Sequence, residues 1–304
     1  MALASGPDLE RANQLVEALA SRGYASTGAP FPTGRPDRAT VPLVTRTGLP
    51  VVAKVFPSPR GELTFANMQT LWRSSFGARR RPPAMPQPID YFPDLNALIM
   101  EHIEGRPLVE LGDADSKVLA EAVRLVACLH ESEAEPRKWR DTRRIVRALG
   151  EKVRHSIETD PRYATVLEPV IEALEAARVD EAELVPCHGD FSPRNVLVGS
   201  GRVVLIDWDR LQWADPARDL AYAAAWCWVW ALRRKVPAEW SVLQQVVDEY
   251  ARCRSIVLTE RGLSFHVAAG LLRIAHAMVT LWPADAPLVP RLAAEALGRL
   301  RQLS

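Results

Sequence analysis

Residues 187–209, CHGDFSPRNVLVGSGRVVLIDWD, constrain the fold of this 304-residue chain more than any other segment. Two short apolar runs, residues 196–198 and 203–206, flank the residues Gly199, Ser200 and Gly201. Glycine tolerates the positive φ angles of a tight turn, and β-branched runs of this length favour strands. The segment therefore predicts a β-hairpin, which fixes Asn195 at its start relative to Asp207 at its end.

Polar residues around this hairpin lie at the spacing that a phosphoryl-transfer site requires. Asp190 and Asn195 are five residues apart, the offset in the kinase catalytic loop between the Asp that receives a hydroxyl proton and the Asn that holds magnesium. Asp207 follows twelve residues later, at the end of a buried apolar run. A triphosphate carries dense negative charge, so its site must neutralise that charge and align the γ-phosphoryl group with an incoming oxygen. The alternative is that an HGD tripeptide and an ID dipeptide occur on a hairpin by chance.

The chain resembles the aminoglycoside phosphotransferase and choline kinase family, small-molecule relatives of the protein kinases. Beyond the loop, the resemblance rests on I-D-W-D at residues 206–209, D-P-A-R-D-L-A at residues 215–221 and L-I-M-E-H-I-E-G at residues 98–105. It implies an α+β, bilobal protein-kinase-like fold. A small antiparallel-sheet N-terminal lobe (residues 1–103) binds nucleotide, and a mainly helical C-terminal lobe (residues 104–304) carries catalysis and the acceptor. ATP or GTP is then the expected phosphoryl donor, in the cleft between the lobes, with Mg²⁺ as cofactor.

The resemblance also implies roles for individual residues of the loop and its surroundings. Asp190 is the expected catalytic residue, and Asn195 and Asp207 are the expected magnesium ligands. His188 and Asp219 are expected to support the loop rather than to carry protons. The hinge between the lobes is expected to contact the nucleotide base through Met100, Glu101, His102 and Ile103.

Lys54 lies in the run V-V-A-K-V, in the second of two strands expected over residues 40–46 and 49–56. Burying an unpaired ammonium group costs several kcal/mol, so a buried Lys54 needs an anionic partner. A triphosphate is the expected partner. A solvent-facing lysine on an edge strand is the alternative. Kinases pair this lysine with a helix glutamate, and Glu62 is the candidate here because Asn67 stands where that glutamate is expected. The preceding loop lacks G-x-G-x-x-G, yet backbone amides near Gly34 are expected to bind phosphate.

Helical periodicity covers most of the remaining chain. A helix capped by Asp8 is expected to end at Gly23, and helical spacing recurs over residues 116–150, over residues 161–177 and after residue 216. Trp226 and Trp230 would share a helix face, where they could cage a choline-like cation or simply pack in the core. Residues 231–304 carry ten basic and six acidic residues, which argues against a carboxylate-lined site for an aminoglycoside.

Composition restricts the partners. The chain has 38 basic and 37 acidic residues, a net charge of +1, so no global field directs it to nucleic acid or a membrane. Nucleoside triphosphate and a small hydroxylated molecule, either an antibiotic or a metabolite, are the expected partners. Four widely spaced cysteines and the absence of a readable signal peptide indicate a cytoplasmic protein. Oligomeric state stays open.

Two other functions compete with a small-molecule kinase. A protein kinase is disfavoured because the chain lacks D-F-G and A-P-E segments in the expected places. A nucleotide-binding pseudokinase with a regulatory role is supported only by the irregular glycine loop and the ambiguous helix glutamate.

Overall fold

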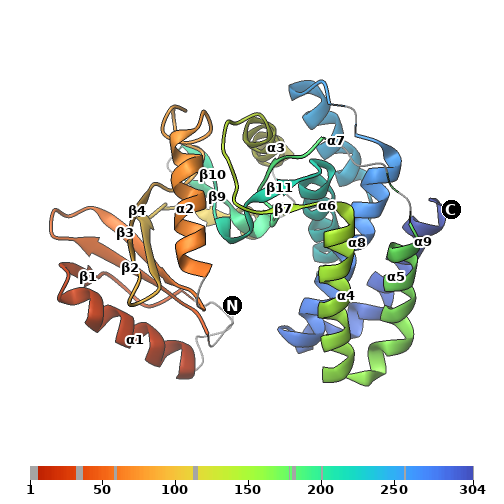
Figure 1. The fold of residues 1–304 in the computed structure, drawn as a ribbon, viewed down its shortest axis with the longest axis horizontal. Coiled ribbons are helices and arrows are strands. Elements are labelled where there is room, and N and C mark those ends of the chain that lie inside the picture. Colours follow the sequence, from red (N-terminus) through yellow and green to blue (C-terminus); the bar gives the residue numbers. More distant parts are fainter. Residues whose placement is uncertain are drawn as a thin grey trace. The chain divides into compact units, whose positions relative to one another are not determined.

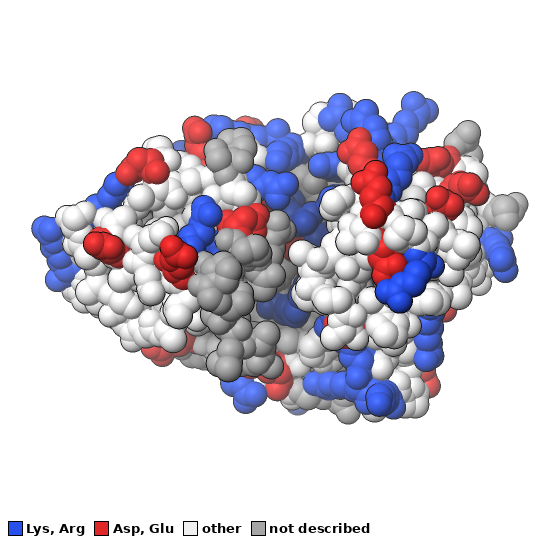
Figure 2. Space-filling model, turned by 90° about the horizontal axis from the view of Figure 1, so that it is seen from below, with Lys and Arg blue, Asp and Glu red and all other residues white. Residues whose placement is uncertain are grey.

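The structure is a computed structural model, and it describes residues 6–31, 37–57, 60–111, 116–177, 179, 183–199, 201–256 and 258–303. The chain forms two compact units (Figure 1), and basic and acidic side chains are both spread over the face that Figure 2 shows. The first unit consists of Met1–Gly105, Ser132–Arg137 and Leu197–Asp209, and the second consists of Arg106–Glu131, Lys138–Val196 and Arg210–Ser304. Asp207 therefore groups with the N-terminal sheet, although it lies far beyond that sheet in the sequence.

The first unit is built on an antiparallel sheet of five strands in the order β1-β2-β3-β5-β4. The strands are β1 (Tyr24–Ser26), β2 (Ala39–Thr45), β3 (Pro50–Val55), β4 (Pro88–Phe92) and β5 (Ala97–Glu101). Helix α1 (Gly6–Ala20) packs its apolar residues against one face of the sheet, and α2 (Arg60–Arg73) lies against β4 and β5.

Alternation along β3 determines which way Lys54 faces. Val51, Ala53 and Val55 belong to the core cluster that includes the apolar residues of α1. Because successive side chains of a strand point to opposite faces, Lys54 lies on the other face of the sheet. Lys54 pairs with Thr40 of β2 and Leu98 of β5, so its strand is interior. The edge-strand alternative for Lys54 is therefore wrong.

The predicted hairpin is present as β9 (Val196–Gly199) and β10 (Arg202–Leu205), with Gly201 at a φ of 73° in the turn. A short 3-10 helix, η4 (Trp208–Arg210), follows it. The buried Trp208 donates its indole N–H to the Leu205 carbonyl at 3.1 Å and packs edge-on against Phe76. These contacts anchor the segment that carries Asp207, whose own φ is 67°.

The second unit is mainly helical. Its α-helices are α3 (Ser116–His130), α4 (Thr142–Thr159), α5 (Ala164–Ala176), α6 (Ala217–Arg233), α7 (Ser241–Cys253), α8 (Glu260–Thr280) and α9 (Val289–Arg301). Its strands are β6 (Arg106–Pro107), β7 (Trp139–Arg140), β8 (Val185–Cys187) and β11 (Gln212–Ala214). Its 3-10 helices are η1 (Leu108–Glu110), η2 (Pro161–Tyr163), η3 (Pro193–Asn195) and η5 (Pro283–Leu288).

Helix α8 lies at the centre of this unit, in contact with α4, α5, α6 and α9. Its burial on nearly all sides explains why its sequence is apolar around the whole helix. Among the described residues α8 is the one helix long and apolar enough to cross a membrane by composition, and 78% of that segment is buried inside the protein. A buried core helix accounts for this composition.

Two helix boundaries differ from the sequence prediction. The first helix begins at Gly6 rather than after a cap at Asp8. The helical spacing over residues 116–150 belongs to two helices, because α3 ends at His130 and α4 begins at Thr142. Asp141 caps α4 by accepting a hydrogen bond from the Arg144 backbone N–H at 2.7 Å, a start signal that periodicity alone does not reveal.

Candidate active site

The loop between β8 and β9 holds Asp190 and Asn195 in one network. The Asn195 side-chain amide donates to the Asp190 carbonyl at 2.8 Å, and its backbone N–H donates to the Ser192 carbonyl at 2.8 Å. The Asp190 backbone N–H donates to Nδ1 of His188 at 3.3 Å. The five-residue offset read from the sequence thus corresponds to a direct hydrogen bond across the loop.

The carboxylate of Asp219, on α6, holds this loop in place through hydrogen bonds. Its carboxylate accepts the backbone N–H groups of His188 at 2.7 Å and Gly189 at 2.8 Å. His130 approaches the same carboxylate at 3.3 Å and contacts the Tyr250 hydroxyl at 2.8 Å. Burial acts to raise the pKa of Asp219, but the interactions of its carboxylate with His130, His188 and the Gly189 N–H group together outweigh burial and lower the pKa. Asp219 therefore stays ionised where two loop N–H groups need an acceptor.

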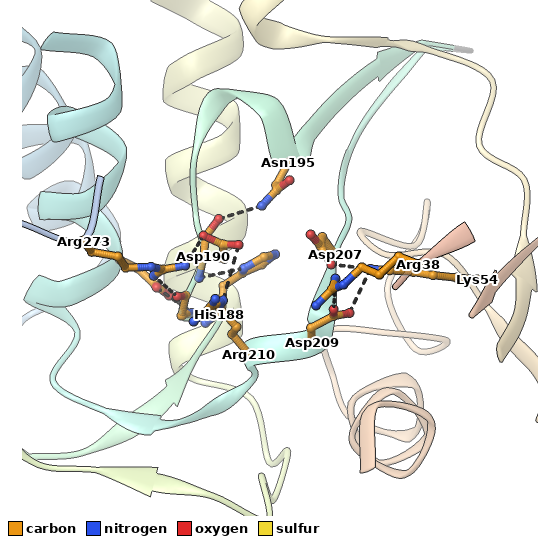
Figure 3. Close-up of polar contacts among 11 residues, drawn as sticks. Arg38, Lys54, His188, Asp190, Asn195, Asp207, Asp209, Arg210 and Arg273 are labelled. Atoms are coloured by element: carbon orange, nitrogen blue, oxygen red, sulfur yellow. Dashed lines mark hydrogen bonds and ion pairs between the residues drawn. The ribbon is translucent and has the colours of Figure 1, made fainter. Parts of the chain in front are cut away.

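The Asp190 carboxylate is paired with arginines that the sequence reasoning missed (Figure 3). Arg273 of α8 donates to Asp190 at 2.5 Å and to the Gly189 carbonyl at 2.7 Å. Nε of Arg210 lies 3.7 Å from the other oxygen of Asp190. Burial is the largest single influence on the pKa of Arg273 and acts to lower it, but the charge and hydrogen bond of Asp190, together with other neighbours, outweigh burial and raise the pKa. A charged residue in the apolar run L-L-R-I of α8 is the signal that could have identified Arg273.

A second group of charges lies within the first unit. Nζ of Lys54 is 2.6 Å from Asp207 and 2.9 Å from Asp209, and Arg38 also pairs with Asp209 at 2.9 Å (Figure 3). Lys54 and Asp207 were both predicted as site residues, and the structure brings them into contact. Arg38 precedes β2 and carried no motif, so the sequence offered no sign of it.

Within the described residues, the structure does not bring Glu62, the predicted helix partner, to Lys54. Glu62 lies exposed in the first turn of α2, and among the described residues the ion pairs of Lys54 are with Asp207 and Asp209. Asn67 is buried, and its side-chain oxygen accepts the Arg137 backbone N–H at 3.3 Å. The two aspartates therefore take the place of a helix glutamate.

The two aspartates have different pKa shifts. For Asp207, burial acts to raise the pKa, but the charge and hydrogen bond of Lys54, the hydrogen bond with Asp209 and the charge of Arg38 together outweigh burial and hold the pKa well below its ordinary value. Burial and the neighbouring charge of Asp207 raise the pKa of Asp209. Burial acts to lower the pKa of Lys54, but both carboxylates outweigh it and raise the pKa. Lys54 and Asp207 are therefore both charged at neutral pH.

The hinge prediction falls on the end of β5 and the residues after it. The Glu101 carboxylate pairs with Arg202 of the hairpin at 2.6 Å. The backbone N–H groups of Glu101 and His102 donate to Gln87 and Pro50 at 2.9 and 3.2 Å. These two donors are therefore already used within the sheet. The remaining predicted hinge residues are Met100, half-buried, and Ile103, buried. Gly34 lies outside the described residues.

The tryptophans of α6 lie in different surroundings. Trp226 is buried in the helical core, with the guanidinium of Arg194 over its ring at 4.2 Å. Trp230 is half-buried, and the guanidinium of Arg233 lies 5.2 Å from its ring centroid. Core packing, the alternative to a cation cage, describes Trp226. Both rings are already in contact with arginines of the chain itself.

One known protein family matches the part of the chain that carries these site residues. The sequence profile of the phosphotransferase enzyme family matches residues 30–256, a span that includes Lys54, the Asp190 loop and Asp207. The chain belongs to this family of phosphotransferases, and the resemblance drawn from the sequence motifs is confirmed. Over 232 residues it is also 25% identical to acyl-CoA dehydrogenase family member 11 of Gallus gallus. That match covers 63% of this chain and 28% of the chicken protein, so it corresponds to only a part of that relative.

Solved structures support the fold. A choline kinase from Cryptosporidium parvum matches with a TM-score of 0.67 and 10% identity over 96% of each chain. A thermostable aminoglycoside phosphotransferase mutant matches with a TM-score of 0.64 and 14% identity over 96% of this chain and 98% of its own. A spectinomycin phosphotransferase in complex with ADP and spectinomycin matches with a TM-score of 0.59 and 13% identity, over 94% and 98%. The expected α+β, protein-kinase-like fold is thus confirmed.

Proposed function

We propose that the protein is a small-molecule kinase that transfers the γ-phosphoryl group of ATP or GTP to a hydroxyl group of an antibiotic or metabolite. The observation that carries this proposal is the loop in which Asn195 is hydrogen-bonded to Asp190 and Asp219 holds the loop amides. Such a loop fixes a base and a metal ligand relative to one another before substrate binds. Bound ADP in the spectinomycin phosphotransferase structure is consistent with a nucleotide donor.

Asp190 is assigned as the group that accepts the proton of the attacking hydroxyl. A general base must be ionised and held in place. By pairing with one carboxylate oxygen of Asp190, the guanidinium of Arg273 favours the ionised form of that carboxylate and fixes its position. The second bond from Arg273, to the Gly189 carbonyl, ties the same guanidinium to the backbone of the loop. We therefore assign Arg273 as a positioning residue for Asp190.

Lys54 is assigned to the phosphates of the nucleotide. Its ammonium group is charged and already arranged toward acceptor oxygens, which lowers the cost of orienting it for a phosphate. Arg38 brings a second positive charge to the same group. The hinge residues Met100 to Ile103 are proposed to contact the base.

Asn195 and Asp207 fit a magnesium ion by their chemistry. An ionised carboxylate and a side-chain amide oxygen are the hard oxygen ligands that Mg²⁺ prefers. The Asn195 amide nitrogen is engaged with Asp190, so its oxygen is the atom left to act as a ligand. A bound ion would neutralise phosphate charge during transfer. The Lys54 pairing keeps Asp207 in the ionised form that such a ligand requires.

The proposal is tested by release of ADP and GDP in the presence of Mg²⁺ and each triphosphate. The acceptor panel contains aminoglycosides, macrolides, sugars, hydroxy acids and amino alcohols, and Asp190→Asn serves as the blank. Acceptor-dependent release that the variant lacks supports a small-molecule kinase. Tight nucleotide binding without release for any acceptor favours the pseudokinase alternative and counts against the proposal.

A further inference from the structure

Five cationic side chains from separate elements of the second unit gather around the Asp190 loop. We call them the cationic cluster: Arg140 of β7, Lys152 of α4, Arg210 at the end of η4, Arg218 of α6 and Arg273 of α8. Helix α4 packs against α8, and a hydrogen bond of 2.6 Å joins Ser156 to His276, which are one turn away from Lys152 and Arg273 on their helices. The charges of the four arginines also act on Lys152. These residues are far apart in the sequence, so the fold rather than a basic run brings them together.

Negative charge in the same region does not balance the cluster. Asp190 is shared by Arg273 and Arg210. Asp219, the other carboxylate that acts on Arg218 and Arg273, is already engaged by the loop N–H groups and by His130. Arg218 has a neutral partner, since the Gln212 amide, oriented to satisfy both of its polar atoms, accepts from it. Among the described residues, Arg140 forms no ion pair and donates one long hydrogen bond, of 3.5 Å, to the backbone carbonyl of Arg144. The cluster therefore keeps an excess of positive charge beside the expected catalytic base.

Lys152 is the member without a partner. Across the described ranges, its ammonium group forms no ion pair or hydrogen bond, although the side chain is half-buried. Burial, followed by the charges of the four arginines, lowers the pKa of Lys152 to about 7. Burial, followed by the charge of Lys152, lowers the pKa of the nearby His276 to about 4. His276 is therefore neutral at neutral pH and adds no charge to the cluster. A partly desolvated ammonium group among like charges is destabilised until an anion joins it.

A second observation argues against a cationic acceptor. Arg194, which lies between Asp190 and Asn195 in the loop, stacks its guanidinium over Trp226 at 4.2 Å and near Trp282 at 5.0 Å. The aromatic face that could have held a choline-like cation is thus occupied by a cation of the chain. Nε of Arg194 is buried without a hydrogen-bond partner, which leaves another donor in the same loop.

We infer that the acceptor is an anionic molecule, a hydroxylated carboxylate or phosphate ester whose negative group binds the cationic cluster through Lys152. The inference rests on the proposed kinase function and deepens it by naming the substrate class. Charge complementarity of this kind selects partners by sign, because a polycationic acceptor would meet like charges next to Asp190. The anionic group binds at Lys152 while Asp190 accepts the proton of a hydroxyl on the same molecule.

Binding of a simple anion tests the cluster without turnover. Inorganic phosphate and acetate are titrated by calorimetry into protein loaded with Mg²⁺ and a nonhydrolysable ATP analogue. We expect one phosphate site that Lys152→Gln weakens about tenfold or more, a change of about 1.4 kcal/mol. Lys235→Gln, an exposed lysine of the same unit, serves as the matched control and should leave the affinity unchanged. Lys152→Arg keeps the charge and should retain binding, which separates loss of charge from loss of folding.

The result that would overturn the inference is no phosphate or acetate binding, or the same binding in Lys152→Gln as in wild type. Failure of the ATP analogue to bind would count against the kinase proposal alone, since Lys152→Gln and Lys235→Gln can still be compared on the free protein.

Turnover then distinguishes the two anionic classes. Glycerate, glycerol 3-phosphate, glycerol and 3-amino-1,2-propanediol share a three-carbon skeleton and differ in charge. We expect kcat/KM to favour one or both anionic compounds, and Lys152→Gln to remove the preference. Preference for glycerate identifies a carboxylate site, and preference for glycerol 3-phosphate identifies a phosphate site. A higher kcat/KM for the neutral or the cationic compound would overturn the inference.

Discussion

Replacing Asp219 by alanine should destabilise the protein and loosen the Asp190 loop. The carboxylate accepts two buried backbone N–H groups, from His188 and Gly189, and it is also the partner of His130. Each buried donor left without an acceptor costs about 1–3 kcal/mol, so the two together predict a loss of about 2–6 kcal/mol in the free energy of unfolding. Because the same amides position Asp190, kcat should fall as well, with a smaller effect on the KM for nucleotide.

Urea denaturation followed by tryptophan fluorescence measures this loss. Asp248→Ala removes an exposed aspartate of α7, which accepts a hydrogen bond from Gln244 at 2.7 Å, and should change the stability by only about 0.5 kcal/mol. Asp219→Asn keeps one acceptor oxygen and should lie between alanine and wild type. A loss below about 1 kcal/mol for Asp219→Ala would show that the loop amides find other partners, and would refute the reasoning.

The pH dependence of the same variant provides an independent check. Because the folded-state pKa of Asp219 is lowered, its contribution is fully present above the pKa of an unfolded aspartate and is lost as pH falls through the folded-state value. The stability difference between wild type and Asp219→Ala should therefore narrow in acid and stay constant near neutral pH. A difference that widens on acidification would contradict the assigned direction.

The remaining predictions concern catalysis and binding. Asp190→Asn should lower kcat by about 10²- to 10⁴-fold with nucleotide affinity retained, as stopped assays and calorimetry would show. Lys54→Ala should weaken nucleotide binding about tenfold or more, and unchanged affinity by calorimetry would refute its phosphate role. Arg273→Gln should lower kcat more than it raises the nucleotide KM, with partial rescue by Arg273→Lys; equal effects on both constants would indicate a purely structural role. Since the pKa of Lys152 is about 7 and only the protonated amine attracts an anion, the acceptor KM should rise as pH increases above 7, and Lys152→Gln should lack this rise.

The parts of the site that could be predicted from the sequence are those set by short-range geometry. Asp190 and Asn195 are joined by a hydrogen bond across five residues, and the hairpin turn at Gly201 has the positive φ that its composition indicated. The apolar run around Lys54 predicted a strand there, and β3 is that strand. These features depend on residues that are close together in the chain, so the local amino-acid sequence is enough to predict them.

The residues that the sequence did not reveal act across long separations. Arg273 meets Asp190 across 83 residues, and Arg38 meets Asp209 across 171. No periodicity encodes such a pair, because tertiary packing alone decides which charges meet. A helix glutamate was the expected partner of Lys54, with Glu62 as the candidate, but the fold brings Asp207 and Asp209 to Lys54 from distant parts of the chain.

The pKa of Asp207 is lowered and that of Asp209 is raised, so these two carboxylates of the first unit are suited to different roles. Two carboxylates separated by one residue share two cations, Lys54 and Arg38, so the group as a whole is balanced. Asp207 has a lowered pKa and is 31% exposed, whereas Asp209 has a raised pKa and is 10% exposed. A metal ligand must be ionised and accessible, which Asp207 satisfies better than Asp209. If Asp207 serves as the proposed metal ligand, Asp209, which pairs with both cations, would hold Lys54 and Arg38 in place.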